Sequence, residues 1–216
     1  MPLDHPNSAP AVTDDASFQA ATGASDAQVA DIEAYRVLLA DWNTRMNLVG
    51  PSAMAEFWGR HAFDSAQLLS LAPEAKVWAD LGAGAGFPGL ILAILLKDDP
   101  DGEVHLVESM AKRCRFLEAV IEALDLPAIV HNARAESIGL RVDRVTARAF
   151  APMERLLTFA QPYFKLGAVG LFLKGEGIDA ELELAAKDWT FQARQFPSRS
   201  DPRGRIVEIK RLYRAQ

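Results

Sequence analysis

A glycine-rich turn between residues 77 and 89 constrains the fold of this chain more than any other feature. The sequence there reads Val-Trp-Ala-Asp-Leu-Gly-Ala-Gly-Ala-Gly-Phe-Pro-Gly, so an apolar segment runs directly into Gly82, Gly84 and Gly86. Glycine suits a backbone that turns tightly and approaches a ligand without a Cβ in the way. Pro88 follows at a place where proline favours the first turn of a helix. We therefore expect a strand, a turn and a helix in that order, with a ligand bound against the turn.

Short apolar segments alternate with helical patterns from Lys76 onward, which is typical of parallel βαβ units. We expect strands at 77–81, 104–108, 128–131, 144–147 and 169–174, and helices at 88–96, 110–124, 153–162 and 178–188. Two further strands, 190–196 and 205–213, flank a turn-rich segment and predict a hairpin. The prediction is an α/β, Rossmann-like methyltransferase fold, with a mostly parallel sheet and a C-terminal antiparallel hairpin. Dinucleotide-binding dehydrogenases continue instead with parallel strands.

The N-terminal third has a different pattern. Residues 1–24 are rich in Pro, Ala, Ser and Asp and predict a disordered acidic tail. Ser25 and Gln28 form a capping-box pattern that starts a helix ending near Trp42, and a second helix is expected over 54–71. We expect residues 25–72 to form a helical segment packed on a core of residues 73–216, as one domain overall.

Composition excludes several classes of protein. The chain has 216 residues, 50% of them hydrophobic, which suffices for the core of one α/β domain. Its longest apolar run, 90–96, is too short to cross a membrane, and the N-terminus lacks a signal-peptide pattern. Cys114 is the single cysteine, so no intramolecular disulfide can form, and no Cys/His cluster has the spacing of a zinc site. We expect a cytoplasmic monomer without a metal and without membrane contact.

The charge distribution matters more than the net charge of −6. Residues 1–33 hold six acidic residues and no Lys or Arg, so the remainder carries 23 basic and 23 acidic residues. Within that neutral body, residues 194–214 hold seven basic residues against two acidic ones. Because phosphates respond to local charge within a Debye length, this stretch predicts a basic face.

The ligand of the turn is not fixed by its glycines. Gly84, Gly86 and Gly89 also satisfy the G-x-G-x-x-G dinucleotide pattern, which is weak on its own. Glu108, at the end of the second strand, can accept hydrogen bonds from the ribose of S-adenosylmethionine or of NAD. Asp80 directly before Leu-Gly-x-Gly-x-Gly, together with the terminal hairpin, favours S-adenosylmethionine. A small-molecule methyltransferase and a dinucleotide-dependent reductase stay open as alternatives.

Two further loops should complete the pocket at the carboxyl ends of the strands. The loop 132–137 is placed to contact adenine, and Arg148 would lie where the methionine end of the cofactor meets the substrate. On its own, Glu136 is also compatible with a solvated loop acid. No catalytic triad or acid/base dyad is evident, so we assign no residue to proton transfer and expect catalysis by positioning.

Candidate RNA contacts are basic residues near the predicted pocket or on the hairpin. His61 is kept as a substrate contact only, because a lone helical histidine is more often a packing residue than a catalyst. The helix after the second strand begins with three basic residues. They could equally well lie on a solvent-exposed face of the helix or contact RNA phosphates. The full set is Arg60, His61, Lys112, Arg113, Arg115, Lys174, Arg199, Arg203 and Arg205.

Several local motifs together resemble one known family over residues 42–210. The motifs are Trp42-Asn43 with Met46-Asn47-Leu48, the segment Arg60 to Ser65, Phe87-Pro88-Gly89, the segment Glu108 to Leu117, Arg148-Ala149-Phe150 and Leu173-Lys174-Gly175. In these the chain resembles the RsmG (GidB, glucose-inhibited division protein B) family of bacterial 16S rRNA guanine-N7 methyltransferases.

The resemblance implies a function and a site. It implies S-adenosylmethionine as cofactor, S-adenosylhomocysteine as product, and 16S rRNA or the small ribosomal subunit as substrate, with the target guanine at nucleotide 527. N7 of guanine carries a lone pair and no proton, so direct in-line attack needs no general base. The cofactor contacts that it implies are Gly82, Phe87, Ala135, Glu136 and Arg148, with Glu108 in the ribose-binding role. Gly84 and Gly86 in the glycine turn are further candidate cofactor contacts, and Arg148 is the candidate catalytic residue.

Overall fold

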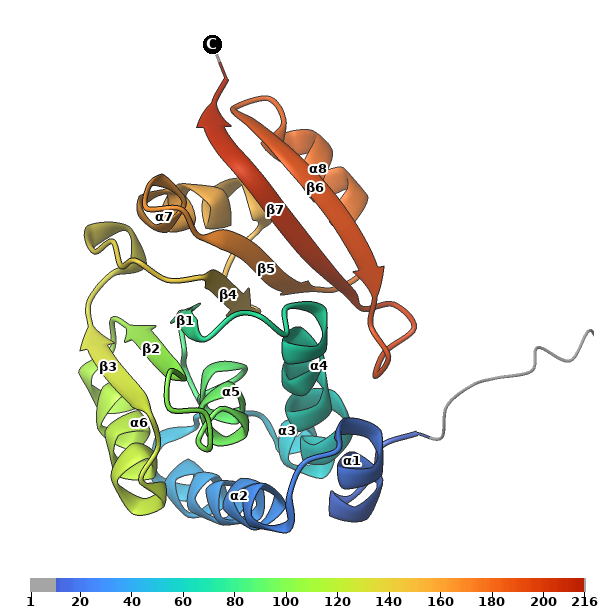
Figure 1. Cartoon of the computed structure of the whole chain (residues 1–216), viewed down its shortest axis with the longest axis vertical. Coiled ribbons are helices and arrows are strands. Elements are labelled where there is room, and N and C mark those ends of the chain that lie inside the picture. The colour runs from blue at the N-terminus through green and yellow to red at the C-terminus, as the bar shows by residue number, and fades with distance from the viewer. Residues whose placement is uncertain (1–10, 216) are drawn as a thin grey trace, which may run out of the picture.

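Seven strands form one sheet at the centre of the computed structural model, which describes residues 11–215 (Figure 1). Their order is β3-β2-β1-β4-β5-β7-β6. The first five strands pair in parallel, whereas β7 runs antiparallel to both β5 and β6. The strands are β1 (Val77–Leu81), β2 (Glu103–Glu108), β3 (Ala128–Asn132), β4 (Arg144–Arg148), β5 (Val169–Lys174), β6 (Trp189–Pro197) and β7 (Arg205–Arg214). The predicted fold class and terminal hairpin are confirmed.

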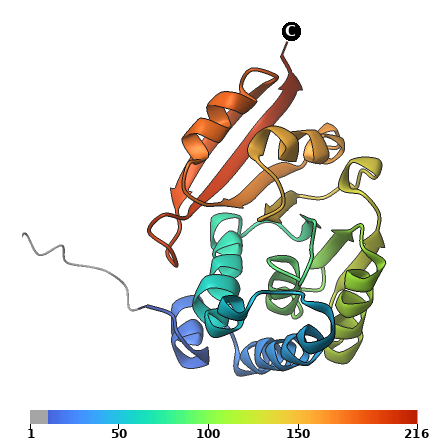
Figure 2. The same ribbon diagram turned by 180° about the vertical axis from the view of Figure 1, so that it is seen from behind.

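Helices cover both faces of the sheet because its strands are apolar on both sides. Neighbouring residues of one strand enter different cores: Trp78 packs with the N-terminal helices, α5 (Gly89–Leu95) and α6 (Ala111–Leu124), whereas Ala79 packs with the opposite cluster. That second cluster is built on α7 (Met153–Lys165) and α8 (Ile178–Ala185), which lie beside the hairpin (Figure 2). Within residues 11–215, no helix is long and apolar enough to cross a membrane.

The N-terminal helices follow the expected order with one difference. The capping box of Ser25 and Gln28 starts α2 (Asp26–Met46), as predicted. The helix expected over 54–71 is broken into α3 (Pro51–Ala55), a π-helical segment η1 (Phe57–Phe63) and α4 (Asp64–Leu71). The wider π turn carries Arg60 and His61, and such turns occur often at functional sites.

The prediction of a disordered tail over residues 1–24 is wrong for its second half. Residues 15–22 form the helix α1 (Asp15–Thr22), closed at its start by a capping box between Asp14 and Ser17. Phe18 is fully buried, with its ring centroid 5.4 Å from that of Trp58. One aromatic side chain thus anchors a segment whose composition is that of a polar tail. Residues 1–10 lie outside the described part of the chain.

The tip of the β6–β7 hairpin is fastened to the N-terminal helices. Asp64, buried on α4, accepts hydrogen bonds from the hydroxyls of Ser198 (2.9 Å) and Ser200. The backbone N–H of Arg199 donates to the side-chain oxygen of Gln67 at 2.7 Å. Segments 134 residues apart in the sequence therefore meet at the edge where β4 and β5 end.

Candidate functional site

The turn after β1 adopts a conformation that requires glycine. Gly82, Gly84 and Gly86 have φ of +70°, +57° and +100°, in the left-handed region that other residues rarely enter. A Cβ on Gly82 would lie 2.3 Å from the ring of Phe150. A Cβ on Gly86 would instead meet Leu90, so Gly86 is required by packing. The turn therefore requires glycine at Gly82 and Gly86 for space as well as for backbone conformation.

Two buried polar side chains hold this turn in place. Asp80 accepts a hydrogen bond from the backbone N–H of Gly89 at 2.9 Å, and burial raises the pKa of its carboxyl from 3.8 to about 7. The hydroxyl of Tyr35, on α2, donates to the carbonyl of Ala85 at 2.6 Å. Sequence patterns do not predict the contact of Tyr35 with the glycine turn, because Tyr35 and Ala85 are 50 residues apart.

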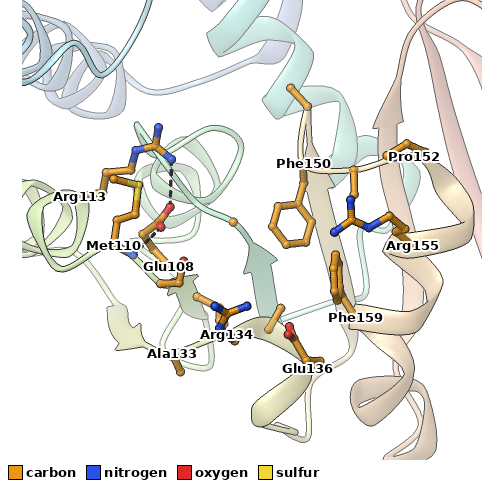
Figure 3. A pocket seen from close by; sticks show the side chains of 16 residues that line it. Glu108, Met110, Arg113, Ala133, Arg134, Glu136, Phe150, Pro152, Arg155 and Phe159 are labelled. Atoms are coloured by element: carbon orange, nitrogen blue, oxygen red, sulfur yellow. Dashed lines mark hydrogen bonds and ion pairs between the residues drawn. The ribbon is translucent and has the colours of Figure 1, made fainter.

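A cavity of about 390 Å³ opens beside the turn and is called the larger cavity below (Figure 3). Glu108 and Arg113 lie on one side of it and Phe150 and Arg155 on the other, with the loop after β3 beneath them. Its volume falls within the range of about 300–1,000 Å³ that is usual for small-molecule sites. The predicted cofactor contacts that line it are Gly82, Glu108, Ala135 and Glu136, the last two on the short helix η2 (Ala135–Ser137).

Glu108 is held by the backbone on two sides. Its Oε1 accepts from the N–H of Met110 at 2.8 Å and its Oε2 from the N–H of Gly84 at 3.0 Å. Arg113 lies 3.7 Å from Oε2, and Glu108 is 4% exposed. An ionised carboxylate offers about four acceptor sites, so two remain for a ligand in the cavity. A pair of vicinal hydroxyls, such as those of a ribose, matches that arrangement.

A second cavity of about 260 Å³, called the loop cavity, adjoins the larger one. Both cavities are lined by Gly82, Arg113 and Ala149, so they share a border at the glycine turn. The remaining predicted cofactor contacts that line the loop cavity are Gly84, Phe87 and Arg148. Gly86 lines neither cavity.

His61, Phe87 and Arg148 form one packed group at the wall of the loop cavity. The His61 ring stacks on Phe87 with centroids 4.8 Å apart, and the Arg148 guanidinium lies 5.9 Å from the Phe87 centroid. Arg148 also hydrogen-bonds His61 Nδ1. Burial, with the charges of Arg148 and Arg60, lowers the pKa of His61 to about 3, so its imidazole is neutral and accepts from Arg148. Burial also lowers the pKa of Arg148 below its ordinary value.

A third cavity, of about 270 Å³, lies toward the hairpin and is called the hairpin cavity. It shares Arg148 and Ala149 with the loop cavity, and Ala149 also lines the larger cavity, so the three cavities meet at the carboxyl end of β4. The predicted RNA contacts that line it are Arg60, Lys174 and Arg205, together with Arg148.

The other predicted RNA contacts are not gathered there. Arg199 lies over the ring of Phe63, 5.1 Å from its centroid, and the Arg203 side chain is 68% exposed. Lys112 and Arg115 are exposed on α6, whereas Arg113 lines the larger cavity. Cys114 between them is buried and hydrogen-bonds the backbone carbonyl of Glu108, as expected for a structural thiol. Sequence reasoning missed Asp64 and Gln67, because their role in holding the hairpin tip depends on long-range contacts that form only in the folded protein.

The strand order, the antiparallel β7 and the acid at the end of β2 define a Rossmann-like methyltransferase fold. The structure is similar to that of a SAM-dependent methyltransferase from Aquifex aeolicus, with a TM-score of 0.55 at 16% sequence identity, over 76% of this chain and 94% of that chain. At this identity the similarity shows the fold.

The chain belongs to the family described as rRNA small subunit methyltransferase G (GidB), whose model matches residues 28–204. It is 62% identical to the ribosomal RNA small subunit methyltransferase G of Caulobacter vibrioides over 206 residues, which cover 95% of each chain. Identity to the protein of the same name from Parvibaculum lavamentivorans is 43% over 208 residues, covering 94% of this chain and 92% of the relative. The resemblance found in the sequence motifs is confirmed.

Proposed function

We propose that the protein transfers a methyl group from S-adenosylmethionine to N7 of the guanine at nucleotide 527 of 16S rRNA. The observation that carries the proposal is the position of Arg148, at the border between the loop cavity and the hairpin cavity. Cofactor contacts lie on one side of this arginine and basic side chains on the other. Membership in a family of small-subunit rRNA methyltransferases supports the same substrate.

The residues of the larger cavity fit S-adenosylmethionine. Glu108 offers two free acceptor sites for the ribose, the glycine turn admits backbone contact, and η2 borders the adenine side. When bound there, the cofactor supplies an electrophilic methyl group on a sulfonium. Gly82, Gly84, Phe87, Glu108, Ala135 and Glu136 are the residues that would hold it, with Gly86 supporting the turn.

Catalysis of this reaction requires that the protein position the guanine against the methyl group and provide a suitable electrostatic environment. Guanine N7 has a free lone pair, so it can attack in line without a base. His61 is not available as one, because its Nδ1 accepts from Arg148 and its pKa is held near 3. A neutral imidazole also adds no cation where positive charge moves onto the purine. Arg148, held by His61 and Phe87, orients the base beside the cofactor.

Two other functions share parts of this site. A dinucleotide-dependent reductase would be stabilised against heat by NAD(H), whereas we expect stabilisation by S-adenosylmethionine and S-adenosylhomocysteine only. A small-molecule methyltransferase would retain its activity as salt increases, whereas methylation of RNA should fall with rising salt. The family match favours RNA.

The product provides the decisive test. N7 methylation places a fixed positive charge on guanine and makes the glycosidic bond labile, so reduction followed by aniline should cut treated 16S rRNA at one new site. Arg148→Ala should lower the methylation rate more than cofactor affinity, if Arg148 acts mainly in the transition state. Methylation of a ribose, of an exocyclic nitrogen or of a molecule other than RNA would contradict the proposal.

A further inference from the structure

The hairpin cavity is a built pocket formed by five separate segments of the chain. Residues of η1 and α4, the ends of β4 and β5, α8 and the tip of the hairpin all line it. The tip is fixed because Asp64 accepts from Ser198 and Ser200 and because Gln67 accepts from the backbone of Arg199. The wall carrying Arg205 is therefore held in place before any ligand binds.

Its charges are unevenly paired. Lys174 is 2.6 Å from Glu181 and also donates to a backbone carbonyl, so this cation is neutralised. Arg60 is 3.2 Å from Asp201. Arg148 and Arg205, by contrast, have no carboxylate within 4.0 Å among the residues that the structure describes. Two guanidinium groups thus line one cavity without a direct ion pair, while the carboxylates that also line it, those of Asp64, Glu181 and Asp201, are each bound to other groups.

The donors of these arginines are also incompletely used. Arg148 donates to the neutral ring of His61, and Arg205 donates through Nη1 to the carbonyls of Pro202 (3.0 Å) and Gly204 (2.7 Å). The Nε of Arg60 is buried and has no hydrogen-bond partner. Arg148 and Arg205 are both half-buried, and a guanidinium fork matches the oxygens of a phosphate.

We infer that the hairpin cavity binds one RNA phosphodiester, next to the target guanosine, through Arg148 and Arg205. The inference rests on the proposed function and adds to it a specific phosphate site. Arg148 lines both this cavity and the loop cavity, so one residue connects the phosphate to the position of the base. The inference also gives the hairpin arginines different roles. Arg205 lines the cavity and contacts one phosphate, whereas the exposed Arg203 contributes only nonspecific electrostatic attraction to RNA.

The test couples a protein change to an RNA change. Small subunits are reconstituted with 16S rRNA that carries one uncharged methylphosphonate, placed either 5′ or 3′ of the target guanosine. With normal RNA, Arg205→Gln should lower kcat/KM about tenfold, as expected for loss of a charge-assisted hydrogen bond. At one of the two linkages, the methylphosphonate should lower kcat/KM of the wild-type enzyme about as much as Arg205→Gln does. At that linkage it should cause no further decrease in kcat/KM of the Arg205→Gln variant.

Arg203→Gln is the matched control, because it removes a guanidinium from the same loop outside the cavity. Its effect should be the same factor on normal and modified RNA. Thermal stabilisation of Arg205→Gln by S-adenosylmethionine, equal to that of the wild type, shows an intact fold, and Arg205→Lys should recover part of the activity. If the methylphosphonate and Arg205→Gln each lower kcat/KM by independent factors that multiply at both linkages, the inference is overturned. The same result is expected if an acidic protein segment, and not an RNA phosphate, occupies the cavity. Absence of guanine N7 methylation by the wild type would instead refute the proposed function.

Discussion

Arg148 hydrogen-bonds Nδ1 of His61 across 87 positions of the sequence, above the ring of Phe87 that both residues contact. The contact joins the π-helical segment η1 to the end of β4, two elements on opposite sides of the glycine turn. It makes His61 a positioning residue for Arg148. Since the imidazole is neutral, its role is to accept a hydrogen bond.

Removal of that acceptor should therefore slow the reaction without weakening cofactor binding. We expect His61→Ala to lower kcat by about 10-fold or more, as for loss of a hydrogen bond to a charged group of about 1.5–3 kcal/mol. Affinity for S-adenosylhomocysteine, measured by calorimetry, should stay within a factor of about two. His61→Gln, which retains an acceptor, should recover part of kcat. Equal losses in the two variants would argue against the positioning role.

The pH dependence of stability should show two opposing contributions. Burial raises the pKa of Asp80 from 3.8 to about 7, so the folded state binds the extra proton and stability falls as pH rises through that interval. The pKa of His61 is lowered from 6.5 to about 3, so the unfolded state binds the extra proton and stability rises with pH there.

Single substitutions should separate these two contributions. Asp80→Asn removes the falling component, so its free energy of unfolding should rise more steeply with pH than that of the wild type. His61→Gln should do the opposite. Urea denaturation at about pH 4.5 and pH 6.5 measures both slopes. Parallel slopes in all three proteins would show that neither group is perturbed in this direction.

Glu108 should contribute strongly to cofactor binding. Glu108→Ala removes the two free acceptor sites and should weaken S-adenosylhomocysteine binding by about 1–3 kcal/mol. Because Glu108 also accepts from the backbone of Gly84 and Met110, the variant needs a check of thermal stability without ligand. Glu136→Ala, on the exposed rim of the same cavity, should cost less. Unchanged affinity in a folded Glu108→Ala protein would remove Glu108 from the ribose-binding role.

Tyr35, which lies on α2, should stabilise the glycine turn. Tyr35→Phe removes the donor to Ala85 and leaves that carbonyl unpaired, so we expect a loss of about 1–3 kcal/mol in unfolding free energy. Cofactor affinity should fall as well, since the turn is less firmly held. Tyr213→Phe, on a side chain that is 62% exposed, is the control and should change neither quantity. The same effect from both substitutions would contradict a specific role for Tyr35.

The helix α1 should be an integral part of the fold. Phe18→Ala deletes a fully buried ring that packs on Trp58 and should cost about 3–5 kcal/mol of stability, by analogy with other core aromatic truncations. Gln19→Ala, at a neighbouring position whose side chain hydrogen-bonds Asp26 at the surface, should cost much less. Chemical denaturation distinguishes the two. A negligible loss for Phe18→Ala would restore the disordered-tail prediction for this segment.

Local signals were sufficient to predict the sheet and to name several residues that the structure brings together around the larger cavity. The βαβ pattern, the glycine spacing and the acid ending β2 each depend on residues close together in the sequence, and the structure confirms each element within a few residues. The tail prediction failed because composition averages over residues, whereas one buried ring, Phe18, decides the conformation.

Long-range contacts could not be predicted from local sequence patterns. Nothing near Tyr35, Asp64 or Gln67 indicates their long-range partners, which are 50 or more residues away. Basic residues could be counted from the sequence, but which of them share a cavity depends on how the hairpin tip lies on α4. The distinction between Arg205 and Arg203 is therefore a property of the tertiary structure alone.

The position of β7 between β5 and β6 has a consequence for folding during synthesis. The strand that follows β6 along the chain must pair with β5 before β6 can join the sheet at all. Until about residue 205 has emerged from the ribosome, the hairpin tip has no register and Asp64 has no serine partners. Because β7 is synthesised after all the strands of the cofactor side, that side of the site can form while the hairpin side is still incomplete. A growing chain of this protein would thus be able to hold its cofactor before it is able to hold its substrate.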